Sequence, residues 1–290
     1  MVLWDWEYDD DFVQALLTGA HRRCLSARAF RPPEFSHFAH LCQGRRFSFP
    51  YLIDRATDVH ASLLPALSQL QKGGTLLIND PEQMIRCRDK ATMHLELVQQ
   101  GIPVPYGIIL SHQDHPEQAA QQAWQKLGTP FVIKPAEGGG GEGVILEATT
   151  PEQIRQALHE SKSGKIILQK KIQPGEIAGH RAWLRVFYVM DQVIPCWWDD
   201  RSHLYSLIAD PTASWLSPIH EIVHHIARLS AMHFFSTEIT LTNEHELYVI
   251  DFVNEMCDMR RQSHHPDGVP DVLFAKIVDL LLSHHPSQAN

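Results

Sequence analysis

The chain of 290 residues has few cysteines, no long hydrophobic run and no excess of positive charge. Its five cysteines are odd in number and scattered, and no two form a C-x-x-C pair, which argues against a disulfide framework and a cysteine zinc cluster. No apolar run approaches the ~18 residues of a membrane span. The first residues also lack the basic and apolar segments of a secretory signal. These absences predict a cytoplasmic protein without a membrane partner.

Acidic residues outnumber basic ones, 34 to 25, and the formal net charge is −9. Because no run of Lys and Arg is present, the chain lacks the electrostatic footprint of a nucleic-acid-binding protein, and we expect no nucleic-acid partner. The hydrophobic content of 44% is that of a globular chain. At ~100–200 residues per domain, the length allows two or three compact units. No pattern in the sequence predicts an oligomeric state.

Apolar runs of strand length alternate with helical patterns along residues 1–79. Strands are expected at 1–6, 25–30, 47–53 and 75–78, and helices at 12–17, 35–42 and 59–70. This alternation predicts the α/β class, with helical crossovers on a small sheet. In the next stretch, helices are expected at 88–100 and 116–127, among strands at 107–110, 131–134 and 143–147.

The most informative segment is a glycine-rich loop between the last two of these strands. Five of the 16 glycines fall within residues 138–143, namely Gly138, Gly139, Gly140, Gly141 and Gly143. Glycine lets backbone amides approach an anion closely, and Lys134 before the loop supplies a positive charge for phosphate oxygens. The segment therefore predicts a phosphate-binding loop. The alternative is an ordinary glycine-rich hairpin tip.

Three better-known nucleotide motifs do not fit this loop. A dinucleotide fingerprint opens a helix, whereas a strand-like run begins here at Val144. A Walker loop places Lys and then Ser or Thr after the last glycine, where this chain has Val144 and Ile145. A protein-kinase loop has its lysine on the strand after the glycines, but Lys134 precedes them.

Together with other motifs in chain order, the loop resembles that of the ATP-grasp superfamily. The most similar patterns are those of RimK-type glutamate ligases and glutathione-synthetase-like enzymes. The other matching segments are Asp89-Lys90, residues 166–172 with Pro174-Gly175-Glu176 after them, residues 183–189, Thr237-Glu238-Ile239 and residues 249–254. The resemblance implies an N-terminal α/β domain at 1–79, a small lobe with the glycine-rich loop at 80–168, and a large lobe at 169–290. ATP would lie between the two lobes.

The resemblance also implies roles for single residues. Lys134 and Arg185 would be catalytic, with Arg185 stabilising charge on the transferred phosphoryl group. The residues that would bind ATP are Lys90, Lys134, the five loop glycines, Gln169, Lys171, Ile172 and Glu176.

Two acids on neighbouring strands are the candidate magnesium ligands. Glu238 and Asp251 flank a polar turn, and an antiparallel pair can bring both near one edge; the alternative is that both face solvent. Mg²⁺ often takes one or two carboxylates together with phosphates. We therefore expect two Mg²⁺ ions with ATP, and Asn254 adds a neutral oxygen ligand. Relatives usually read acid-x-Asn, but this chain reads Asp251-x-x-Asn254, so the third ligand is either Asn254 or Glu255.

A competing motif runs from His220 to His224 and matches the H-E-x-x-H signature of zinc peptidases. Apolar residues at 219, 222, 223, 226 and 229 form a helical stripe, and both histidines lie at its flank. We therefore predict a packing helix with a solvated histidine edge.

The resemblance implies an ATP-dependent carboxylate–amine ligase for small-molecule or peptide substrates, which forms an acyl phosphate and releases ADP and phosphate. One alternative is a small-molecule kinase on the same fold, but no basic cluster for a phosphorylated acceptor stands out. Another is a non-catalytic, ATP-binding regulatory module, which the retention of Lys134, Arg185, Glu238 and Asp251 argues against.

Overall fold

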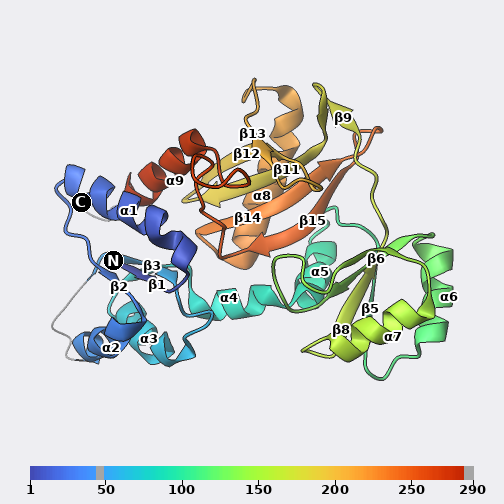
Figure 1. The fold of residues 1–290 in the computed structure, drawn as a ribbon, viewed down its shortest axis with the longest axis horizontal. Helices are drawn as coiled ribbons and strands as arrows, with labels where there is room; N and C mark the ends of the chain where they lie inside the picture. The colour runs from blue at the N-terminus through green and yellow to red at the C-terminus, as the bar shows by residue number, and fades with distance from the viewer. Residues whose placement is uncertain (44–48, 284–290) are drawn as a thin grey trace. The chain divides into compact units, whose positions relative to one another are not determined.

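The structure is a computed structural model that describes residues 1–43 and 49–283 (Figure 1). The chain divides into two compact units. The first unit contains Met1–Met84, Arg185–Ser236 and Asn254–Asn290, and the second contains Ile85–Leu184 and Thr237–Val253. The expected division into three segments at residues 79 and 168 remains a prediction. Within the described ranges, no helix combines the length and hydropathy needed to cross a membrane.

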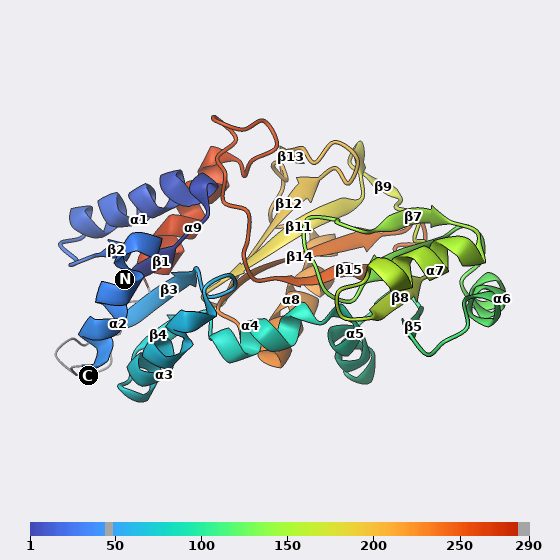
Figure 2. The ribbon, with the colours of Figure 1, turned by 60° about the horizontal axis from the view of Figure 1, so that its bottom comes forward.

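The first unit begins with a parallel sheet of order β2-β1-β3-β4. Its elements are β1 (Val2–Trp4), a 3-10 turn (Glu7–Asp9), α1 (Asp10–Arg22), β2 (Ala29–Phe30), a 3-10 turn (Pro32–Glu34), α2 (Phe35–Gln43), β3 (Tyr51–Arg55), a 3-10 turn (Ala61–Leu63), α3 (Leu64–Lys72) and β4 (Leu76–Ile78). Leu3 and Leu52 pack with α2 and α3, whereas Val2 and Ile53 pack with α1 and α9 (Asp271–Ser283), on the other face (Figure 2). This alternation confirms the α/β prediction. Residues 47 and 48 of the expected third strand lie outside the described residues.

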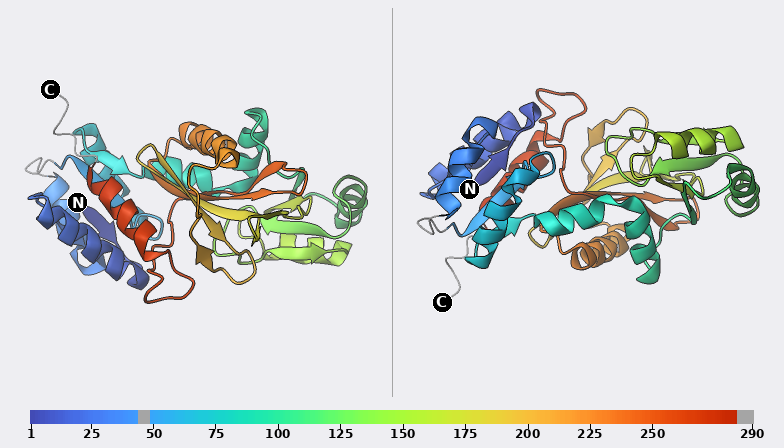
Figure 3. Two further views of the ribbon diagram at one scale, coloured as in Figure 1. Left: turned by 90° about the horizontal axis from the view of Figure 1, so that it is seen from above. Right: turned by 90° about the horizontal axis from the view of Figure 1, so that it is seen from below.

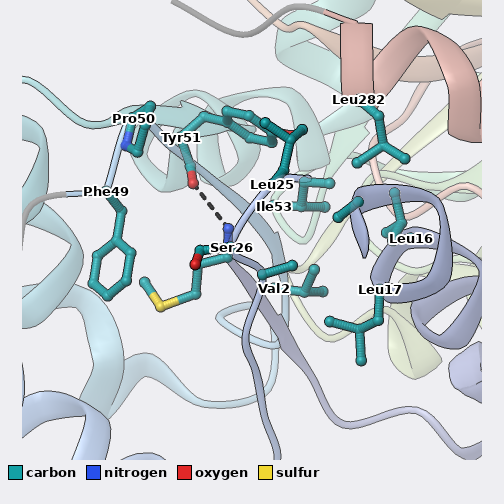
Figure 4. Close-up of a pocket in the computed structure, with 13 residues that line it drawn as sticks. Val2, Leu16, Leu17, Leu25, Ser26, Phe49, Pro50, Tyr51, Ile53 and Leu282 are labelled. Atoms are coloured by element: carbon teal, nitrogen blue, oxygen red, sulfur yellow. Dashed lines mark hydrogen bonds between the residues drawn. The ribbon is translucent and has the colours of Figure 1, made fainter. Parts of the chain in front are cut away.

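A small apolar cavity of about 50 Å³ lies beside β1 and β3 (Figure 4). Val2, Leu16, Ile53 and Leu282 are among its lining residues. Small-molecule sites usually enclose ~300–1,000 Å³. The cavity is therefore a gap in the apolar packing and too small for such a ligand.

The second unit is built on an antiparallel sheet of order β5-β8-β6-β7. Its elements are α5 (Lys90–Gln99), β5 (Gly107–Ser111), α6 (Pro116–Lys126), β6 (Phe131–Pro135), β7 (Ile145–Ala148), α7 (Pro151–Glu160) and β8 (Lys165–Gln169); α4 (Pro81–Arg88) contains the boundary between the units. Successive side chains of β8 point to opposite faces. Ile166 and Leu168 pack with α6 and α7, and Ile167 packs with α5 (Figure 1).

The remaining strands include a sheet of order β13-β12-β11-β14-β15. The elements of this part are β9 (Glu176–Ile177), β10 (His180–Arg181), β11 (Trp183–Val189), β12 (Gln192–Trp198), β13 (Tyr205–Ser206), a 3-10 turn (Ser214–Leu216), α8 (Ser217–Ser230), β14 (Phe234–Leu241) and β15 (Leu247–Asn254). Strands β11, β14 and β15 each contain residues of both units. In the first unit α8 packs on the sheet, where His224 lies edge-on to Tyr188 of β11 (Figure 3).

Candidate functional site

The glycine-rich loop joins the antiparallel neighbours β6 and β7. Its residues Gly138, Gly140, Gly141 and Gly143 have φ of 121°, 61°, 76° and 71°, in a region that residues with a Cβ atom rarely adopt. At Gly138, Gly140 and Gly141 no atom lies within 4 Å of the position a Cβ would take, so the dihedral angles rather than crowding favour glycine there. Because β7 and not a helix follows the loop, the structure agrees with the exclusion of the dinucleotide fingerprint.

Lys90 is the first residue of α5, and Asp89 fixes this helix start. The Asp89 carboxylate accepts hydrogen bonds from two amides of the first helical turn, at 2.9 and 3.1 Å, and from Lys165 Nζ at 2.7 Å. The Lys90 amide donates to the carbonyl of Ala136 at 2.7 Å, which ties the helix start to the segment leading into the loop. The Lys90 ammonium donates to the carbonyl of Gly138. The structure therefore brings Lys90 and the loop together.

Lys134 on β6 lies among the other predicted charges. Its ammonium donates to the carbonyl of Ile250 at 2.8 Å. Burial lowers the pKa of Lys134, the charges of Asp251 and Glu238 raise it, and the charge of Lys90 lowers it. Their influence on the pKa of Lys134 places Lys90, Glu238 and Asp251 near it within the second unit.

Hydrogen bonds hold both acids in place. The indole Nε1 of Trp183 lies 3.2 Å from Glu238 Oε2, and Thr237 Oγ1 donates to the Asp251 carbonyl at 2.6 Å. Hard carboxylate oxygens beside two lysines suit a magnesium–triphosphate complex, in which phosphates complete the metal coordination. Within the described ranges no three His, Cys, Asp or Glu side chains form a metal-binding group. A site with two protein carboxylates is compatible with that finding.

The predicted adenine-binding segment begins at Gln169, the last residue of β8. Gln169 is 2% exposed, and its Nε2 has no hydrogen-bond partner among the described residues. A buried amide donor without an acceptor is unfavourable, and a ligand with an acceptor atom would relieve this. Lys171 pairs with Glu147 of β7, Ile172 is half-buried and Glu176 is exposed. Their nucleotide roles remain predictions.

Arg185 and Asn254 belong to the first unit. The Arg185 guanidinium lies over the Trp198 indole, 4.5 Å from the ring centroid, and its Nη1 is 3.5 Å from Ser236 Oγ. In the orientation of its carboxamide that satisfies both neighbours, Asn254 accepts from Arg185 Nη1 at 3.3 Å and donates to the Met256 carbonyl at 3.1 Å. The Asn254 oxygen thus faces Arg185. Its role as a metal ligand, and that of Glu255, remain predictions.

A buried ion pair holds the segment that follows Asn254. Arg55 binds both carboxylate oxygens of Asp9, at 2.7 and 2.6 Å, and also donates to the Cys257 carbonyl at 2.9 Å. The Cys257 thiol donates in turn to the Asn254 carbonyl at 3.3 Å. Burial raises the pKa of this thiol to about 12, so it stays protonated and able to donate.

The H-E-x-x-H motif and Arg260 lie outside the predicted nucleotide site. His220 and His224 lie on α8, so the predicted helix is confirmed. Arg260 forms ion pairs with Asp258 and Asp267, which raise its pKa and neutralise its charge.

The contacts of two tryptophans were not predicted from the sequence. Trp183 and Arg185 are two residues apart on β11 and therefore share a face, which was a usable signal for Trp183. Trp198 lies on β12, and no local spacing relates it to Arg185.

Comparison with known proteins establishes the family. The RimK-like ATP-grasp domain matches residues 87–255, which is more than half of the chain. The chain belongs to the RimK-like ATP-grasp family. The predicted resemblance is therefore confirmed.

Curated relatives match this family member over part of their length. A "Probable alpha-L-glutamate ligase" of Xanthomonas oryzae pv. oryzae is 36% identical over 131 residues, which are 44% of this chain and 41% of that protein. A "Glutamate--LysW ligase ArgX" of Sulfolobus acidocaldarius is 31% identical over 114 residues, 38% of this chain and 39% of that protein. The matched regions thus span only about two fifths of these relatives.

Solved structures agree on the ATP-grasp fold. The ATP-grasp ligase PsnB, complexed with minimal precursor, Mg and ADP, has a TM-score of 0.69 at 16% identity, with 97% of each chain covered. D-alanine–D-alanine ligase from Bacillus anthracis, complexed with ATP, has a TM-score of 0.69 at 13% identity, with 97% of this chain and 94% of that chain covered. The predicted ATP-grasp fold is confirmed.

Proposed function

We propose that this member of the RimK-like ATP-grasp family is an ATP-dependent ligase that joins a carboxylic acid to an amine. One observation carries the proposal: the Lys134 ammonium donates to the carbonyl of Ile250, the residue before Asp251, and the charges of Asp251, Glu238 and Lys90 act on its pKa within the second unit. Two cations and two hard-oxygen ligands are what a magnesium-bound triphosphate requires. The glycine-rich loop, which Lys90 contacts, supports the same assignment.

The protein groups would act by binding and by charge stabilisation. Lys90, Lys134 and the amides of residues 138–143 would bind the phosphates, and the Gln169 amide would donate to the nucleotide. Mg²⁺, which we propose as two ions held by Glu238 and Asp251, would neutralise the phosphates and orient them. Arg185 would stabilise negative charge on the phosphoryl group during its transfer.

The reaction would need no protein nucleophile. A substrate carboxylate oxygen would attack the γ-phosphorus, and the bond to ADP would break, which leaves an acyl phosphate. The amine would then attack the acyl carbon, lose a proton and release phosphate. Because two relatives are named as glutamate ligases, we propose glutamate as one of the two substrates, the other being a small molecule or a peptide.

A hydroxylamine trap tests this proposal. The protein would be incubated with ATP, MgCl₂, hydroxylamine and a panel of carboxylic acids that includes glutamate and glutamate-ended peptides. We expect a hydroxamate together with equal amounts of ADP and phosphate, and neither with the Asp251→Asn variant. AMP and pyrophosphate as products would contradict the acyl-phosphate route, and a stable phosphorylated alcohol would instead identify a kinase.

A further inference from the structure

Arg185 of the first unit rests on an aromatic surface. Its guanidinium carbon lies 4.5 Å from the centroid of the Trp198 indole, which ends β12. Ser236 and Asn254 meet an edge atom of the guanidinium, Nη1, at 3.5 and 3.3 Å. The indole therefore lies across the guanidinium plane, and Ser236 and Asn254 lie at its edge.

The turn between β12 and β13 positions a second ring on Trp198. The imidazole of His203 stacks on the indole with 5.2 Å between centroids and 12° between planes. His203 has φ of 61°, which is uncommon for a residue with a Cβ atom. Its amide donates to the Asp199 carbonyl at 2.8 Å, the Asp199 amide donates to the Leu204 carbonyl at 2.9 Å, and Asp199 Oδ1 accepts from Ser202 N at 2.7 Å. This turn thus holds the imidazole against Trp198.

Trp197, the residue before Trp198 on β12, packs in the apolar core. Trp197 is 4% exposed and stacks on Trp215, with 5.2 Å between centroids and 20° between planes. Successive strand residues point to opposite faces. Trp197 therefore packs against an apolar neighbour, whereas the half-buried Trp198 contacts the Arg185 guanidinium.

We infer that Trp198 is a positioning residue, which holds the Arg185 guanidinium in the orientation used during phosphoryl transfer. Tryptophan is the strongest aromatic partner of a cation. A ring stacked on the guanidinium plane restricts this long side chain and leaves N–H groups at its edge for oxygen acceptors. The inference rests on the role of Arg185 in the proposed function.

Three single variants separate positioning from packing. Trp198→Leu keeps an apolar side chain without a ring, Trp198→Phe keeps a ring, and Trp215→Leu makes the same change at a half-buried tryptophan of the neighbouring stack. We expect Trp198→Leu to lower kcat by about 3- to 30-fold, which corresponds to ~0.7–2 kcal/mol, with the Kd for ATP unchanged within twofold. Trp198→Phe should retain most of kcat. Trp215→Leu should lower the melting temperature without a comparable loss of kcat.

A double-mutant cycle tests whether Trp198 acts through Arg185. In an Arg185→Lys background, the loss caused by Trp198→Leu should largely disappear, because the guanidinium it orients is gone. Equal losses in both backgrounds would overturn the inference. So would a kcat in Trp198→Leu equal to that of the wild type.

A spectroscopic measurement distinguishes failure of this inference from failure of the proposed function. The ring current of Trp198 should shift the Arg185 side-chain NMR resonances of the wild type and of Trp198→Phe, and the shift should be absent in Trp198→Leu. If no substrate panel yields ADP or a hydroxamate from the wild type, the proposed function fails, and the resonances still report the Trp198–Arg185 contact. Identical Arg185 resonances in the wild type and Trp198→Leu would overturn the positioning role by themselves.

Discussion

Replacing Lys134 by methionine removes the charge while keeping most of the side-chain volume. The Lys134 ammonium contacts the carbonyl of Ile250 and lies among the charges of Lys90, Glu238 and Asp251. A charge-assisted contact to phosphate contributes ~1.5–3 kcal/mol. The variant should therefore bind ATP about 10- to 150-fold more weakly, at 1.4 kcal/mol per factor of ten.

The fold should tolerate the same change because two effects oppose each other. The pKa of Lys134 is lowered mainly by burial, so its charge is less favourable in the folded chain than in water. Its removal relieves this penalty but leaves the Ile250 carbonyl without its donor. We expect the free energy of unfolding at pH 7 to change by no more than ~1 kcal/mol.

The lowered pKa also predicts a pH dependence. Between the folded-state pKa of Lys134 and the ordinary value of 10.5, the unfolded chain binds more protons than the folded chain. The Lys134 contribution to stability therefore rises with pH across this window. Because the Lys134→Met variant lacks this contribution, the difference in stability between wild type and variant should change with pH there.

Titration calorimetry with ATP and Mg²⁺ and denaturant unfolding at several pH values measure both effects. Lys162→Met, which changes an exposed lysine of the same unit, is the matched control and should alter neither. An unchanged ATP affinity in folded Lys134→Met would refute the phosphate-binding role. A stability difference that does not depend on alkaline pH would refute the account of the buried charge.

Three further predictions concern the same unit. Asp251→Asn should reduce Mg²⁺-dependent ATP turnover by orders of magnitude in a folded protein, because octahedral Mg²⁺ is strict about ligand geometry; near-normal turnover would remove Asp251 from the metal site. Asp89→Ala should lower the free energy of unfolding by ~0.5–2 kcal/mol through loss of the helix cap, and a denaturation midpoint equal to that of the wild type would contradict this. Amides of Gly138–Gly143 should exchange rapidly without ATP and slowly with AMPPNP and Mg²⁺; equal exchange by mass spectrometry would exclude ordering of the loop.

Local sequence patterns predicted most helices and strands. The positions where these elements begin and end depend on their hydrogen-bond partners. The helix expected at 88–100 begins at Lys90, because Asp89 adopts an extended backbone and caps α5, while Arg88 is the last residue of α4. The strand expected at 25–30 is only Ala29–Phe30, since these two residues alone pair with β1. In both cases the decisive contact involves backbone N–H or C=O groups, which hydrophobic periodicity does not report.

The candidate site was predictable where it is made of contiguous motifs. The glycine-rich loop, Lys134 and the acids stand out because each combines an unusual composition with a fixed order along the chain. The hydrogen bonds that hold the segment after Asn254 were not predictable. They depend on Arg55 meeting Asp9, 46 positions away, and the Cys257 carbonyl, 202 positions away. Such pairings follow from the packing of layers and leave no local spacing in the sequence.

The altered spacing after Asp251 has a structural consequence. In a regular strand, residues two apart share a face and residues three apart do not. An acid-x-Asn spacing would place the carboxylate and the asparagine on one face of the strand. In this chain Asn254 is three residues from Asp251, and its side-chain oxygen accepts from Arg185. The extra residue thus accounts for an asparagine that contacts the arginine. Because β15 ends at Asn254, strand alternation does not extend to Glu255, whose role as a metal ligand remains a prediction. The Cys257 thiol and the Arg55–Asp9 pair, which hold this turn, thereby also hold the asparagine that contacts Arg185.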